Sequence, residues 1–115
     1  MSVELRVTTR IQGTIGILDV SGDVTDTAHD PLMSAYQDVI HRGAKKILLT
    51  FQPKSFINSA GIRVVMAVAF QAEKKKQALR VTGLSPHMIE IFNLVGLTSY
   101  LTIHNSEKDS LKGWS

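Results

Sequence analysis

The sequence predicts an α/β fold: a layer sandwich in which about four helices cover a mixed central sheet of about four to five strands. Two patterns predict it: apolar and polar residues alternate at the start of the chain, and strand-like and helix-like segments take turns through its second half. A length of 115 residues suits one domain. We therefore expect residues 1–115 to form a single domain around one core.

The first half of the chain predicts a hairpin, a helix and a buried strand. Alternation over 5–11 and 14–19, with Gln12-Gly13 between them, indicates two antiparallel strands and hence a mixed sheet. A helix that Gly43 ends is indicated by apolar residues at helical spacing: Leu32, Ala35, Tyr36, Val39 and Ile40. The uninterrupted apolar run in 46–51 is typical of a central strand covered on both faces.

The second half predicts two further strands, at 79–82 and 100–104, and three helices. The chain is expected to turn back into the core at Phe56-Ile57. It is then expected to form an almost wholly apolar helix from Ser59 to about Lys76. Ser85 and Pro86 predict the start of a shorter helix, and a terminal helix is expected to run through Leu111. Core positions are expected at Met66, Ala69 and Phe70 in the long helix and at Met88, Ile91, Phe92 and Val95 in the shorter one.

Composition argues against several classes of function. The chain has no cysteine and a net charge of +3, and its one basic cluster, 74–76, suits the end of a helix better than a nucleic-acid surface. No leader-like or membrane-spanning run is present, so we expect a cytoplasmic protein without membrane contact. Phosphate-binding glycine loops are absent, and ligand-like spacing is lacking among the histidines His29, His41, His87 and His104. We expect no cofactor and no metal.

The segment around Ser59 carries the functional prediction. Ser59 is expected at the N-cap of the long helix, where unpaired N–H groups and a partial positive charge would stabilise a phosphate on its hydroxyl. Arg63, one turn along, is expected to pair with that phosphate. A purely structural cap is the alternative. A hydrolase nucleophile elbow is disfavoured because Ile57 occupies the place of its first glycine, so we expect no enzyme.

These residues resemble the STAS family of anti-sigma factor antagonists, whose signature places Asp-Ser-Ser-Gly, or a close variant, at the start of the second helix. Here the segment reads Asn58-Ser59-Ala60-Gly61, and the segments 20–23 and 91–97 and residue Gly43 are similar to other family landmarks. The family's phosphorylated serine falls on Ser59. Two residues depart from the signature: Asn58 replaces the aspartate, and Ala60 replaces the second serine.

The resemblance implies partner switching in a bacterial regulatory pathway. The unphosphorylated protein would capture an anti-sigma factor that is also a serine kinase, phosphorylation of Ser59 would release the kinase, and a phosphatase would reset the cycle. Predicted partner contacts are Asp23, Val24, Thr25, Asp26, Asn58, Ala60, Gly61 and Arg63, although Asp23 and Asp26 are better explained as turn residues. We expect a monomer or weak dimer. The alternative is an unphosphorylated docking module of a stressosome-like, transporter or lipid-trafficking complex.

Overall fold

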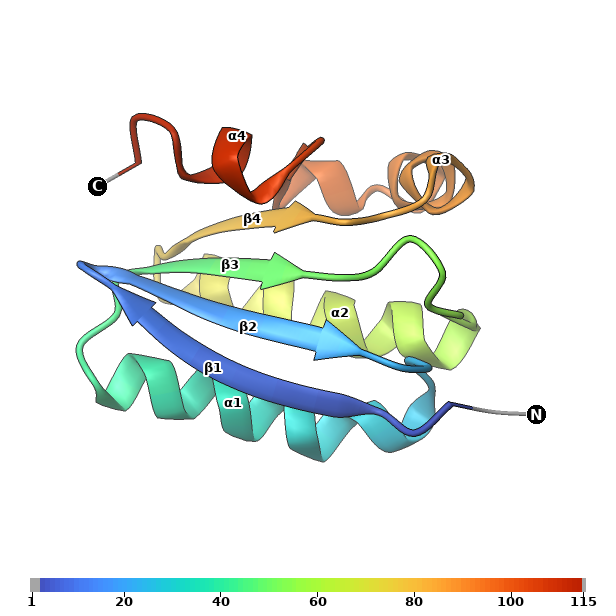
Figure 1. The fold of residues 1–115 in the computed structure, drawn as a ribbon, viewed down its shortest axis with the longest axis horizontal. Coiled ribbons are helices and arrows are strands. Elements are labelled where there is room, and N and C mark those ends of the chain that lie inside the picture. The colour runs from blue at the N-terminus through green and yellow to red at the C-terminus, as the bar shows by residue number, and fades with distance from the viewer. Residues whose placement is uncertain (1–2, 115) are drawn as a thin grey trace.

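A five-stranded mixed sheet organises the protein, of which the computed structural model describes residues 3–114 (Figure 1). The strands lie in the order of the chain: β1 (Arg6–Gln12), β2 (Ile15–Ser21), β3 (Lys46–Thr50), β4 (Ala78–Thr82) and β5 (Thr102–His104). β1 is antiparallel to β2, and every later pairing is parallel. The predicted opening hairpin and mixed sheet are confirmed, with strand boundaries shifted by one or two residues.

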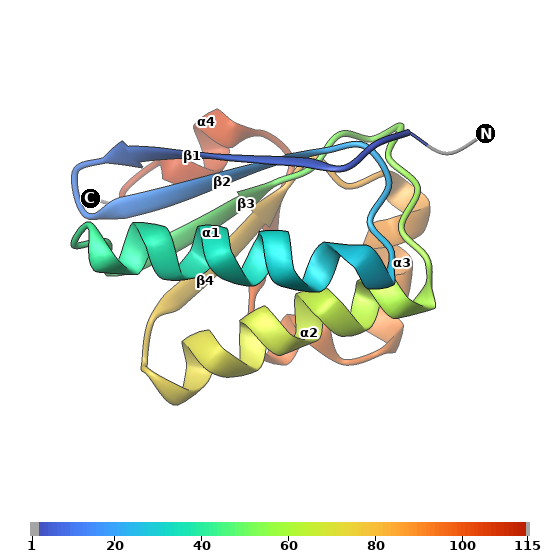
Figure 2. The ribbon, with the colours of Figure 1, turned by 90° about the horizontal axis from the view of Figure 1, so that it is seen from below.

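The helices lie on both faces of this sheet. They are α1 (His29–His41), α2 (Ser59–Lys74), α3 (Pro86–Leu94) and α4 (Glu107–Leu111), with short 3₁₀ turns η1 (Asp26–Ala28) and η2 (Leu97–Ser99). Figure 2 shows α1 and α2 side by side under one face of the sheet, with α4 above the other. The predicted layer sandwich with four helices is therefore confirmed.

The main core fills the space between the sheet and helices α1 and α2. Leu18, Leu49 and Val81 point into it from β2, β3 and β4, and each is fully buried. Burying a side chain of this kind stabilises the fold by about 1.5–3 kcal/mol. Ile47, Leu48 and Leu49 are all 0% exposed, which confirms that β3 is covered on both faces.

The second face of the sheet is covered by the end of the chain. Trp114, 6% exposed, packs with Ile15, Ile17 and Leu48 in a separate small cluster. The Arg80 guanidinium lies 4.2 Å from the centroid of the Trp114 ring, close enough for a cation–π interaction. Periodicity gave no signal for this contact, because Trp114 belongs to no amphipathic helix or strand.

An ion-pair network holds α4 to the hairpin. Arg10 Nε lies 2.6 Å from Asp19 Oδ2, and Arg10 Nη2 lies 2.8 Å from Glu107 Oε1. The Thr50 hydroxyl donates to Asp19 Oδ1 at 2.7 Å. The hydrogen bond from Arg10 is the main reason that the pKa of Asp19 lies below its ordinary value of 3.8.

This network predicts a pH dependence of stability. A carboxylate whose pKa is lowered by folding stabilises the protein at neutral pH, and the contribution disappears as the pH falls below about 4. We expect urea unfolding to show that Asp19→Asn is less stable than the parent at pH 7. The difference in unfolding free energy between the two proteins should shrink toward pH 3. Asp26→Asn, which alters an exposed carboxylate, is the control and should show a constant small difference. A gap for Asp19→Asn that widens in acid would contradict the prediction.

Three apolar residues expected inside lie at the surface. Phe56 is 60% exposed, Phe70 is 49% exposed and Val95 is 42% exposed. In the extended segment before α2, successive side chains alternate, so the burial of Ile57 turns Phe56 outward. Phe70 lies on the side of α2 away from the sheet, and Val95 is the C-cap of α3, where the helix ends. The other expected core positions are buried or packed against the core.

Candidate functional site

Two loops meet at the carboxyl ends of β2 and β3. Val24 and Ile57 form an isolated parallel bridge, in which Val24 N–H donates to Phe56 O at 2.8 Å and Asn58 N–H donates to Val24 O at 3.2 Å. This bridge joins segments that are more than thirty residues apart in the chain. It brings the loop after β2 against the start of α2, so the residues predicted as partner contacts lie at one end of the molecule.

Asn58, and not Ser59, is the N-cap of α2. Its backbone is extended, at φ −93° and ψ −177°, and its Oδ1 accepts from Gly61 N–H at 2.8 Å. The prediction that Ser59 caps this helix is therefore wrong. Asparagine and serine are about equally good caps. The bridge at Ile57 keeps the chain extended as far as Asn58 and so selects Asn58.

Ser59 is the first helical residue, and its side chain is exposed. Its hydroxyl makes no hydrogen bond within residues 3–114. The first two amides of α2, at Ser59 and Ala60, have no acceptor in the same range, because the Asn58 amide oxygen serves the third. An accessible hydroxyl therefore lies beside two free N–H donors at the positive end of a 16-residue helix.

Val24 and Gly61 are structural residues. Val24 is 0% exposed, and a Cβ on Gly61 would lie 2.0 Å from the Val24 carbonyl oxygen. Both residues were predicted as partner contacts, but both are buried where α2 crosses closely over the β2 loop, so neither presents an exposed side chain. Their role is to hold the two loops together.

The acidic residues of the β2 loop differ from each other. Asp23 Oδ2 accepts from Val3 N–H at 2.9 Å, and Asp23 N–H donates to Val3 O at 3.0 Å, so this residue fastens the N-terminal segment. Asp26 is exposed in η1 and its carboxylate has no hydrogen bond among the described residues. Thr25 caps η1 and its hydroxyl lies 3.1 Å from that of Thr27. Of the two carboxylates, only that of Asp26 is free to meet a partner.

Arg63 lies one turn after Ser59 on α2. Its side chain is exposed and has no ion-pair partner within residues 3–114. Residues four apart on a helix are neighbours on the same face. The guanidinium is thus within reach of a charge added at Ser59. Ala60, between them in sequence, is half-buried.

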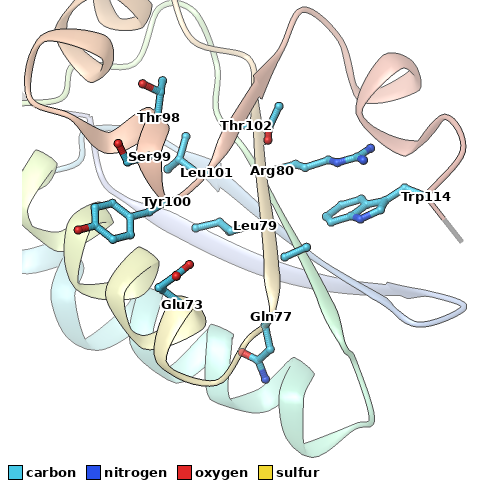
Figure 3. Close-up of a pocket in the computed structure, with 11 residues that line it drawn as sticks. Glu73, Gln77, Leu79, Arg80, Thr98, Ser99, Tyr100, Leu101, Thr102 and Trp114 are labelled. Carbon is cyan, nitrogen blue, oxygen red and sulfur yellow. The ribbon is translucent and has the colours of Figure 1, made fainter.

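Ser59 lines none of the main surface hollows of residues 3–114. A cavity of about 310 Å³ lies toward the other end of α2, at the start of β4, where Tyr100, Arg80 and Trp114 contribute to its wall (Figure 3). Among residues 3–114 no cluster of three or more His, Asp or Glu side chains is placed to hold a metal ion. The same residues include no helix long and apolar enough to cross a membrane.

Comparison with known proteins identifies relatives along most of the chain. A family model described as "Mlab, STAS domain" matches residues 7–103. BtrV of Bordetella bronchiseptica, named as an anti-sigma factor antagonist, is 28% identical over 89 residues, which are 77% of this chain and 77% of BtrV.

Solved structures share the fold at lower sequence identity. An anti-sigma factor antagonist from Mycobacterium paratuberculosis matches with a TM-score of 0.77 at 16% identity, over 94% of this chain and 92% of that one. The phosphorylated form of SpoIIAA, a Bacillus cell fate determinant, matches with a TM-score of 0.65 at 14% identity, over 94% of this chain and 96% of that one.

Proposed function

Because this chain belongs to the STAS domain family, we propose that it is a bacterial anti-sigma factor antagonist whose partner binding is switched off by phosphorylation of Ser59. The observation that carries the proposal is the exposed, unbonded Ser59 hydroxyl at the first turn of α2. Two likenesses support it: BtrV is named as an anti-sigma factor antagonist, and SpoIIAA, which has this fold, has been solved with and without phosphate. A cytoplasmic site of action belongs to the same proposal.

The chemistry requires a partner that brings ATP. The Ser59 Oγ attacks the γ-phosphorus of ATP, the new Oγ–P bond forms as the bond to the β-phosphate oxygen breaks, and ADP leaves. The hydroxyl proton passes to a base of the kinase. This chain supplies only the accepting hydroxyl, in line with a regulatory binding protein that is not an enzyme. Ser59 is suited to this role because its side chain can enter another protein's active site without local unfolding.

The phosphate would be accommodated where it forms. It carries a charge of about −1.5 to −2, which the free amides of Ser59 and Ala60 and the Arg63 guanidinium would stabilise. The domain therefore stays folded when it is modified. What changes is the surface charge, because an uncharged hydroxyl becomes a dianion. A partner that packs closely there must either desolvate this dianion or be repelled by it.

The test is the binding of Ser59 variants to each purified anti-sigma-factor kinase of the host, measured by calorimetry without ATP. We expect Ser59→Ala to bind one of these kinases as tightly as the parent. Ser59→Asp places a negative charge at the switch position and is expected to weaken binding at least tenfold. With ATP added, intact-mass measurement should find one phosphate on the parent and none on Ser59→Ala.

A charge control separates the switch from general electrostatics. Asp109 is an exposed residue of α4, on the opposite face of the sheet from α2, and Asp109→Asn alters the charge away from Ser59, so it should leave affinity unchanged. Equal binding by Ser59→Asp and Ser59→Ala, together with no phosphate on Ser59, would contradict the switch. It would favour a docking module that works without phosphorylation.

A further inference from the structure

The side of α2 away from the sheet changes character along its length. Ser59, Arg63, Met66 and Phe70 recur at intervals of four, three and four residues, which places them on one face of the helix. Ser59 and Arg63 are exposed and polar, Met66 is half-buried, and Phe70 is 49% exposed. One continuous face thus begins at the proposed phosphorylation site and ends in apolar side chains.

A second aromatic ring lies against Phe70. The ring centroids of Phe70 and Tyr100 are 4.9 Å apart with an interplanar angle of 72°, an edge-to-face pair. Tyr100 follows η2 and is 40% exposed, and Figure 3 shows its ring at the edge of the 310 Å³ cavity. Each ring restricts the other, so the pair presents apolar area at a low further cost in side-chain entropy. Rigid aromatic groups of this kind are common anchors of protein interfaces.

The size of a stable interface relates this pair to Ser59. A standard interface covers about 800 Å² on each partner, equivalent to a disc of about 16 Å radius. Phe70 is eleven residues after Ser59 on α2, a distance of about 16 Å along the helix axis. A protein that binds stably around Ser59 must therefore reach, in at least one direction, about as far from Ser59 as Phe70 lies.

The exposed residues on the two sides of Ser59 favour the direction toward Phe70. On the side of Ser59 toward the start of α1, the exposed residues Asp26, His29 and Asp30 are polar or charged. Toward Phe70 the outward face of α2 carries the Phe70 ring with Tyr100 beside it, and the exposed charges of Glu73 and Lys74 lie farther along the helix. Interface cores are enriched in aromatic residues and depleted of charge.

We propose that the partner binds along the outward face of α2, from Ser59 to an apolar anchor formed by Met66, Phe70 and Tyr100. This inference rests on the proposed function, since its occupant is the anti-sigma-factor kinase that phosphorylates Ser59. The kinase offers an apolar hollow for the two rings and a hydrogen-bond acceptor for the Tyr100 hydroxyl. Ser59 acts as the switched end of this surface, and the anchor supplies affinity that does not depend on phosphorylation.

The test compares Phe70→Ala and Tyr100→Ala with Ser59→Asp, using the host kinase that binds the parent. Both alanine variants should weaken binding at least tenfold, while Tyr100→Phe keeps the ring pair and loses less. In the phosphorylation reaction Phe70→Ala should raise KM for this protein and leave kcat unchanged, because the anchor is remote from the accepting hydroxyl. Gln12→Ala, at the exposed end of the β1–β2 hairpin, is the control and should bind like the parent.

Thermal unfolding separates lost contacts from lost structure. Because Phe70 and Tyr100 are about half exposed, each alanine variant should melt within about 4 °C of the parent. Parent-like affinity and KM in both variants, with binding lost in Ser59→Asp, would overturn the anchor and leave the proposed function standing. Failure of the parent to bind or be phosphorylated by any host kinase would contradict the proposed function itself.

Discussion

Replacing Gly61 with alanine is expected to destabilise the protein by about 2–3 kcal/mol, although the same change inside an ordinary helix stabilises it by about 1 kcal/mol. The sign reverses because the new Cβ would lie 2.0 Å from the Val24 carbonyl oxygen. That oxygen also accepts from Asn58 N–H, so relief of the clash breaks the bridge between the two loops. Urea unfolding of the purified variant measures the effect.

The matched control for Gly61→Ala is Ser59→Ala, which introduces the same residue two positions earlier in α2. Ser59 is exposed and makes no hydrogen bond among the described residues, so this variant should stay within about 0.5 kcal/mol of the parent. A Gly61→Ala variant that equals or exceeds the parent in stability would mean that the loops separate at little cost. In that case α2 and the β2 loop would not form one rigid site.

Removing the Trp114 side chain is expected to cost about 3 kcal/mol of unfolding free energy. The ring covers Ile15, Ile17 and Leu48, which would otherwise be left open to solvent on the second face of the sheet. The cation–π contact with Arg80 adds to this apolar burial. Chemical denaturation of Trp114→Ala, followed by circular dichroism, measures the loss.

Two comparisons separate the contributions of the Trp114 ring. Trp114→Phe keeps an aromatic cover and should recover more than half of the stability. In a double-mutant cycle, Arg80→Ala and Trp114→Ala should show a coupling energy of about 0.5–1 kcal/mol. An unfolding midpoint of Trp114→Ala equal to that of the parent would contradict the view that the end of the chain completes the fold.

Much of the fold was predictable because it depends on local periodicity. The alternation before Gly13 indicated the hairpin, and the apolar run around Leu48 indicated a strand covered on both faces. The start of α3 was predictable from Ser85 and Pro86, since the Ser85 hydroxyl does accept from Met88 N–H at 3.2 Å. Each signal lies within a few residues of the element that it predicts.

Local sequence signals did not place the first residue of α2 correctly. Asn58 and Ser59 are adjacent residues of similar capping preference, so composition alone does not choose between them. The choice follows from the bridge between Val24 and Ile57, which keeps the chain extended up to Asn58. The consequence is functional, because Ser59 is left with a free hydroxyl beside unpaired amides instead of a capping bond.

Local patterns along the chain were enough to predict the order of strands and helices, the buried central strand and the position of Ser59 at the start of α2. Three other features follow from long-range packing: Gly61 is held against Val24, Phe70 faces outward, and Trp114 closes the second face of the sheet. Backbone geometry imposes a local repeat that a short segment already displays. Which side of an apolar helix is covered, and which distant segments meet, depends on how the whole chain packs.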